Sequence, residues 1–173
     1  MPNTSRRAVL TLPVSLAFSR VSMAMAQPSL SALAALLSDI PGWEAEKPDT
    51  MAMSQGGISI SYATRGYAQG EKQLTAMLGR TGIEQQFAMA AGDRRGDFSI
   101  ETGETSLRSR TLRGFRVFTA YDAADKDGLV LVFLHANAAS TFVLQFDGMT
   151  LDEALAHAQR FDWAAMQRAV GGR

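Results

Sequence analysis

Apolar and polar residues alternate along much of the chain, which is the pattern of half-buried β-strands. Ile58, Ile60 and Tyr62, for example, alternate with small residues. The stretch 129–134 is apolar without interruption, which predicts a strand covered on both faces. We expect about six main strands, at 58–63, 74–78, 106–112, 115–121, 129–134 and 141–146, with short pieces at 43–47 and 98–101.

Apolar residues at helical spacing predict helices at both ends of the chain and one in the middle. Ser29 is placed to cap the first helix, and Thr150 and Glu153 have the T-x-x-E spacing of a capping box. Asp162 is placed to cap a last helix. The expected helices lie at 27–40, 83–91, 150–161 and 162–170. We expect 51–57 to be a loop, because the Pro-Asp-Thr sequence before it breaks the chain.

This order of elements predicts an α+β fold. Links of turn length join most successive strands, so the sheet should be mostly antiparallel, with the N-terminal, middle and C-terminal helices packed on it. The sequence contains no internal repeat and no composition shift typical of a linker. We therefore expect residues 27–173 to form one domain.

The first 26 residues have the organisation of a cleaved export signal. Arg6 and Arg7 precede a short apolar run, and the sequence around them resembles the twin-arginine motif. The run is about half the length of a membrane span and contains Pro13, which argues against a permanent anchor. Cleavage between Ala26 and Gln27 would follow an A-x-A site. We expect a periplasmic or secreted protein, with an ordinary secretory signal as the alternative.

Composition excludes several function classes. The chain is 46% hydrophobic and 20% charged, which is typical of a globular protein, and its formal net charge is zero, which argues against nucleic-acid binding. It contains no cysteine, so disulfides, thiolate metal sites and cysteine nucleophiles are excluded. We expect no cofactor.

The densest basic stretch is the candidate contact site for a partner or an anion. Arg108 and Arg110 should share one face of a strand, and Arg113 and Arg116 continue along the chain. Guanidinium groups bind carboxylate and phosphate through paired hydrogen bonds. The alternative is a solvated face neutralised by nearby glutamates.

Two other residue types suggest chemistry more weakly. His135 follows the most apolar strand and could serve a small hydrolase, but the sequence has no G-x-S-x-G motif to supply a serine. Met51 and Met53 could hold copper through their thioethers in an oxidising compartment. Methionine more often fills a core or a flexible interface, so we expect no metal site.

Several segments together resemble small periplasmic proteins of proteobacteria whose function is uncharacterised. These are the leader, the Leu-rich first helix, Pro41-Gly42-Trp43, the strand meander, and the closing segment from Leu151 to Trp163. The order of elements is similar to the PsbP/DcrB-like α/β/α group, which implies a non-enzymatic accessory or binding protein. The resemblance implies no functional residue at any position.

The sequence therefore predicts a soluble periplasmic accessory or binding protein without catalytic activity of its own. Its partner would be another periplasmic protein or a small anionic ligand. The alternatives are a hydrolase that uses His135 and a metal carrier that uses its methionines.

Overall fold

The computed structural model describes residues 29–55, 58–81, 96–135 and 140–171. The leader with Arg6, Arg7 and the Ala26–Gln27 cleavage position lies outside the described residues, as does the helix expected at 83–91.

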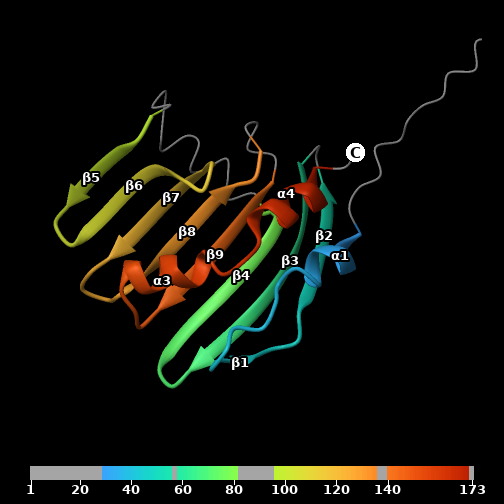
Figure 1. The fold of residues 1–173 in the computed structure, drawn as a ribbon, viewed down its shortest axis with the longest axis horizontal. Helices are drawn as coiled ribbons and strands as arrows, with labels where there is room; N and C mark the ends of the chain where they lie inside the picture. Colours follow the sequence, from blue (N-terminus) through green and yellow to red (C-terminus); the bar gives the residue numbers. More distant parts are fainter. Residues whose placement is uncertain (1–28, 56–57, 82–95, 136–139, 172–173) are drawn as a thin grey trace, which may run out of the picture.

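Nine strands of the described chain form one antiparallel sheet (Figure 1). Their bounds are β1 Glu44–Ala45, β2 Asp49–Gln55, β3 Ile58–Gln69, β4 Lys72–Arg80, β5 Phe98–Thr102, β6 Thr105–Leu112, β7 Phe115–Asp122, β8 Asp127–Phe133 and β9 Thr141–Asp147. The antiparallel sheet is confirmed, but it has more strands than the sequence predicts. The loop expected at 51–57 is wrong, because most of this segment is β2, which pairs with β3 along its whole length.

The order of the strands in the sheet differs from their order in the chain. Strands β5 to β9 form a meander that begins at the far edge and returns toward β4, so that β9 lies between β4 and β8. The opposite edge is built from β1 and β2, which both pair with β3. The central strand β8 is buried on both faces through Val130, Leu131 and Val132, as its apolar run predicts.

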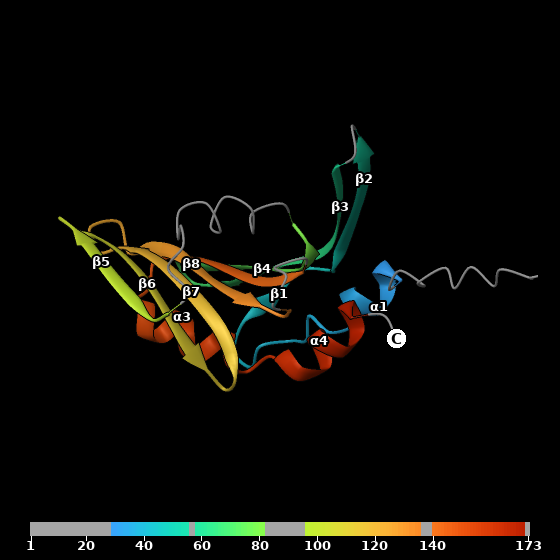
Figure 2. The same ribbon diagram turned by 90° about the horizontal axis from the view of Figure 1, so that it is seen from above.

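Three described helices pack on the same face of the sheet (Figure 2): α1 Leu30–Ala34, α3 Leu151–Ala158 and α4 Trp163–Val170. The predicted caps are confirmed. Ser29 caps α1, Thr150 and Glu153 form a complete capping box on α3, and Asp162 caps α4. The first helix is shorter than the expected 27–40, since the regular α-helix begins at Leu30 and ends at Ala34.

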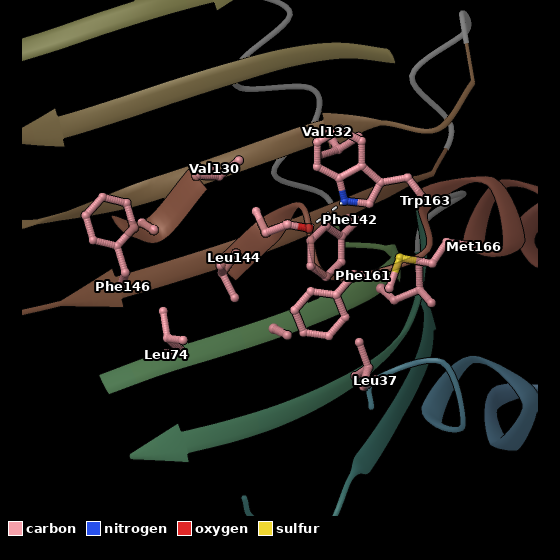
Figure 3. Packing of buried hydrophobic residues seen from close by; sticks show 14 of the residues in the cluster. Leu37, Leu74, Val130, Val132, Phe142, Leu144, Phe146, Phe161, Trp163 and Met166 are labelled. Carbon is pink, nitrogen blue, oxygen red and sulfur yellow. Dashed lines mark hydrogen bonds between the residues drawn. The ribbon is translucent and has the colours of Figure 1, made fainter. Parts of the chain in front are cut away.

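The core lies between these helices and the face of the sheet that they cover, here called the helix-covered face (Figure 3). Phe142 and Phe161 approach with ring centroids 4.9 Å apart. The indole of Trp163 is fully buried and donates a hydrogen bond to the carbonyl of Ala158 at 2.9 Å, which satisfies its only polar atom. Met166 and Leu37 complete the cluster from α4 and from the segment after α1.

Arg65 on β3 links the sheet to the segment between α1 and β2 through hydrogen bonds and an ion pair. Its guanidinium donates to the carbonyls of Leu37 and Glu46 and pairs with Asp39. It also lies 5.4 Å from the centroid of the Tyr67 ring. Burial raises the pKa of Tyr67 to about 12, although the Arg65 charge acts in the other direction.

The first residues of β3 and its partner β2 turn away from the rest of the sheet, toward the side opposite the helices (Figure 2). Gly79 pairs with Tyr62 where β4 nears its end, and its φ of 136° is accessible almost only to glycine. A Cβ at Gly79 would meet the carbonyl oxygen of Ser61 and come within 2.9 Å of the Tyr62 Cα. The missing side chain therefore permits the close approach of β3 to β4 at this point.

The other face of the sheet, here called the opposite face, carries a smaller apolar cluster. Phe118, Leu131 and Val143 are buried there, and Met77 and Phe133 pack against them half-buried.

Candidate functional site

A hollow of about 410 Å³ lies on the opposite face, where β4, β8 and β9 run side by side. Its polar lining comes from Gln73 and Thr75 on β4, Gln145 and Asp147 on β9, and Asp127 on β8. Strand register brings these side chains together, because Gln73 pairs with Asp147 and Thr75 pairs with Gln145. Leu74 and Phe146, the neighbours of these polar residues along their strands, point into the helix-covered core.

Two carboxylates, those of Asp127 and Asp147, line the hollow where the pairing of β8 with β9 ends. Gly128 and Phe146 are the last pair between β8 and β9, and Asp127 and Asp147 are the next residue on each strand, so continuing this register would place the two aspartates opposite each other. Carboxylates placed directly opposite on neighbouring strands repel each other. Within the described part of the chain, neither aspartate has an ion-pair partner. The hollow can therefore accept hydrogen bonds and positive charge.

Gly128 lies in the lining of the hollow, between Tyr121 and Phe146 on the neighbouring strands. On the helix-covered face, the rings of Tyr121 and Phe146 stack at 6.0 Å across the position of Gly128. A Cβ at Gly128 would meet the Phe146 ring at 2.9 Å. The aromatic pair covers the glycine backbone, which is a known way to stabilise a strand that contains glycine.

Arg108 and Arg110 project together from β6 on the helix-covered face, as the alternation predicts. They pair with Thr119 and Val117, and Val117 belongs to the core beneath the helices. Both are exposed. Arg108 forms an ion pair with Glu101 at 2.9 Å, whereas none of the described carboxylates pairs with Arg110.

The other two candidate arginines lie elsewhere. Arg113 is in the β6–β7 turn with a φ of 53°, donates to the carbonyl of Gln159 and lies 5.3 Å from the Trp163 ring centroid. Arg116 points to the opposite face and donates to the Ser109 hydroxyl at 3.3 Å. The two-residue turn sets this division, because it places Thr111 opposite Arg116. The contact site at these four arginines stays a prediction.

The two histidines lie on separate elements. His135 follows β8, and its ring approaches Gly171 at the end of α4. Its Nε2 is buried and has no hydrogen-bond partner among the residues described, so no described hydroxyl or carboxylate meets that nitrogen. His157 on α3 packs edge-on against Trp43 at 5.1 Å. Burial, with the Arg160 charge, lowers the pKa of His157.

Met51 and Met53 point to the same face of β2 and are 51% and 50% exposed. The Tyr62 hydroxyl donates to the Met51 sulfur at 3.4 Å. The described chain contains no group of three or more His, Cys, Asp and Glu side chains that could hold a metal ion. A copper site would therefore depend on the two thioethers, and the metal-carrier alternative stays a prediction.

Comparisons of the chain with protein-family models, with curated proteins and with solved structures found no match. None of the helices in the described ranges is long and apolar enough to cross a membrane.

Sequence reasoning missed the hollow, although part of its signal is visible in the chain. Gln73 and Thr75 flank the apolar Leu74, and Gln145 and Asp147 flank Phe146. Each pair shows a polar face on a strand whose other face is buried. The sequence does not show that these two polar faces become neighbours, because that depends on β9 inserting next to β4.

Proposed function

We propose that this protein is a non-catalytic binding or accessory protein that acts in the periplasm after export. The observation that carries the proposal is the hollow on the opposite face, with Asp127 and Asp147 both in its lining. A cationic group between the two carboxylates would relieve their repulsion and be held by charge-assisted hydrogen bonds. The ligand at this site would therefore carry an amine or guanidinium group.

The amides of Gln73 and Gln145 support the same proposal. Each can donate and accept hydrogen bonds, so together they can orient a ligand whose charge the aspartates bind. The hollow is open to solvent. It can therefore admit a ligand that binds reversibly, or the basic side chain of a partner protein.

Spermidine is a suitable cationic probe, and inorganic phosphate is its anionic counterpart. At low salt we expect spermidine to raise the melting temperature of the wild-type protein and phosphate to leave it unchanged. The double variant Asp127→Asn, Asp147→Asn should lose the spermidine response. Asp152→Asn removes one negative charge from an exposed position on α3 and should keep the response, and each single variant, Asp127→Asn or Asp147→Asn, should weaken it. If phosphate stabilises the protein and spermidine does not, the proposal that the ligand is cationic is wrong.

Catalysis has its own test. A screen with esterase, phosphatase and peptidase substrates should show no turnover that disappears in His135→Ala. Loss of a measured activity in that variant would replace the binding proposal with the hydrolase alternative. Metal analysis of protein purified from the periplasm tests the carrier alternative.

Export is tested independently of function. Replacing Arg6 and Arg7 by lysine should block delivery to the periplasm, because the twin-arginine route requires the arginine pair. N-terminal sequencing of the exported protein should begin at Gln27. Unchanged periplasmic yield would assign the leader to the general secretory route.

A further inference from the structure

Strand β2 lies at one edge of the described sheet, and its residues from Asp49 to Ser54 are exposed. Its neighbour β3 runs beyond the end of β4: Ser61 pairs with Arg80, the last residue of β4, and among the described strands residues 58–60 pair with β2 alone. The result is a projecting two-stranded ribbon, formed by β2 and the first residues of β3 (Figure 2). An isolated two-stranded ribbon is only marginally stable in water, and additional strands stabilise it.

One face of this ribbon is apolar. Met51 and Met53 pair with Tyr62 and Ile60, so all four side chains lie on the same side. The two methionines are the large hydrophobic residues that stand out as exposed in the described structure. The Tyr62–Met51 hydrogen bond holds the first of them against the ribbon.

Although β2 begins at the charged Asp49 and follows Pro48, the rest of this edge lacks the devices that normally prevent strands from pairing between molecules. Natural edge strands are protected by charges, proline, bulges or shortness. From Thr50 to Gln55, β2 contains neither a charged residue nor a proline. At the other edge of the sheet, β5 is shorter and carries Glu101, which is paired with Arg108.

The sequence of β2 also has an internal symmetry. Thr50-Met51-Ala52-Met53-Ser54 presents the same residue types when it is followed in either direction. When two copies pair antiparallel about a two-fold axis at Ala52, Met51 of each copy meets Met53 of the other, and Thr50 meets Ser54. A two-fold interface requires this kind of self-complementarity, since the same patch serves on both sides.

We propose that two copies of this chain associate through β2, antiparallel and centred on Ala52. The two ribbons become one four-stranded sheet, with the four methionines clustered on its apolar face beside Ile60 and Tyr62. Backbone hydrogen bonds across the new strand pair supply the contact, and the methionines give it its register. The proposal is independent of the ligand proposed for the hollow.

Sedimentation velocity of the purified protein over a wide range of concentrations tests the association. We expect a monomer–dimer equilibrium in the wild-type protein. Met53→Lys should yield monomer, because it places a charge opposite Met51 on both sides of the axis. Met53→Leu should retain the dimer, and Ala156→Lys, which adds the same charge on exposed α3, should do so as well. The melting temperature of Met53→Lys should equal that of the wild-type protein at concentrations where the wild type is monomeric, which would show that the variant is folded.

A charge-pair variant tests the register. In Met51→Lys combined with Met53→Glu, the introduced lysine of each copy faces the introduced glutamate of the other, so dimerisation should return and should weaken with salt. Wild-type protein that is monomeric at all concentrations would overturn the proposal. A dimer that survives Met53→Lys, or a charge-pair variant that stays monomeric, would overturn it too.

Discussion

The two faces of the sheet bury very different numbers of apolar side chains. Phe142 lies on the helix-covered face and is fully buried against Phe161, whereas Phe133, on the neighbouring strand, points to the opposite face and is half-buried. The helix-covered face joins most of the buried apolar residues into one core, and the opposite face combines a small apolar cluster with the polar hollow. The helix-covered face therefore buries most of the apolar surface, and the polar side chains of the hollow lie on the other face.

The largest difference between the faces should appear when the same residue type is truncated on each. Phe142→Ala should lower the free energy of unfolding by about 3–5 kcal/mol, because it leaves a cavity in a close-packed core. Phe133→Ala should cost clearly less, since its side chain already contacts solvent. Urea unfolding of both variants measures the difference, and equal losses would contradict the division of roles between the faces.

A smaller loss should follow from Gly79→Ala, which acts where the sheet bends toward the opposite face. The positive φ alone costs about 1–3 kcal/mol for a residue with a Cβ, and the contact with β3 adds to it. Gly70→Ala is the matched control, because Gly70 also has a positive φ but open space around it. In thermal unfolding, Gly79→Ala should have a lower melting temperature than Gly70→Ala. The reverse order would show that the approach of β3 to β4 is not the constraint.

The capping box of α3 should have an effect of about 1 kcal/mol on the helix-covered face. Thr150→Ala removes the side chain that accepts from the Glu153 amide and should lower stability by about that amount in urea unfolding. Ala156→Ser, at an exposed position of the same helix, should have a smaller effect.

The same box predicts a dependence on pH. Hydrogen bonds from Thr150, together with Lys72, lower the pKa of Glu153 from 4.5 to about 2. A lowered pKa means that the ionised carboxylate stabilises the fold above pH 4.5, and that this contribution is lost as the pH falls toward 2. The difference in melting temperature between wild type and Glu153→Gln should shrink over this range. A difference in melting temperature that stays constant with pH would mean that the charge of Glu153 does not contribute to stability.

The smallest effect on stability is expected for the exposed arginines of β6. The double variant Arg108→Gln, Arg110→Gln should leave the melting temperature nearly unchanged, because exposed ion pairs contribute about 0–1 kcal/mol. If these residues contact a partner, capture of that partner from periplasmic extract should weaken, most visibly at low salt. A large loss of stability with intact capture would assign the arginines a structural role.

Features that depend on neighbouring residues could be predicted from the sequence. The caps at Ser29, Thr150 and Asp162 are correct, because a cap needs only a side chain and a backbone amide a few positions away. The strands predicted at β3, β4, β6, β7 and β9 are correct for the same reason, since one buried face imposes a period of two, and the uninterrupted apolar run correctly predicts β8, which is buried on both faces. The share of the fold that follows from such local patterns includes most strands and the helix starts.

The tertiary structure decided what depends on residues far apart in the chain. Asp49–Gln55 is a strand because β3 extends far enough to pair with it. Its own sequence does not distinguish a strand from a loop. The insertion of β9 beside β4 brings Gln73 opposite Asp147 and so creates the hollow, and the short turn at Arg113 sends Arg116 to the other face. Local patterns fix which face of a strand is buried, but the pairing of strands is settled by the packing of the whole sheet, which is a non-local contribution to the free energy.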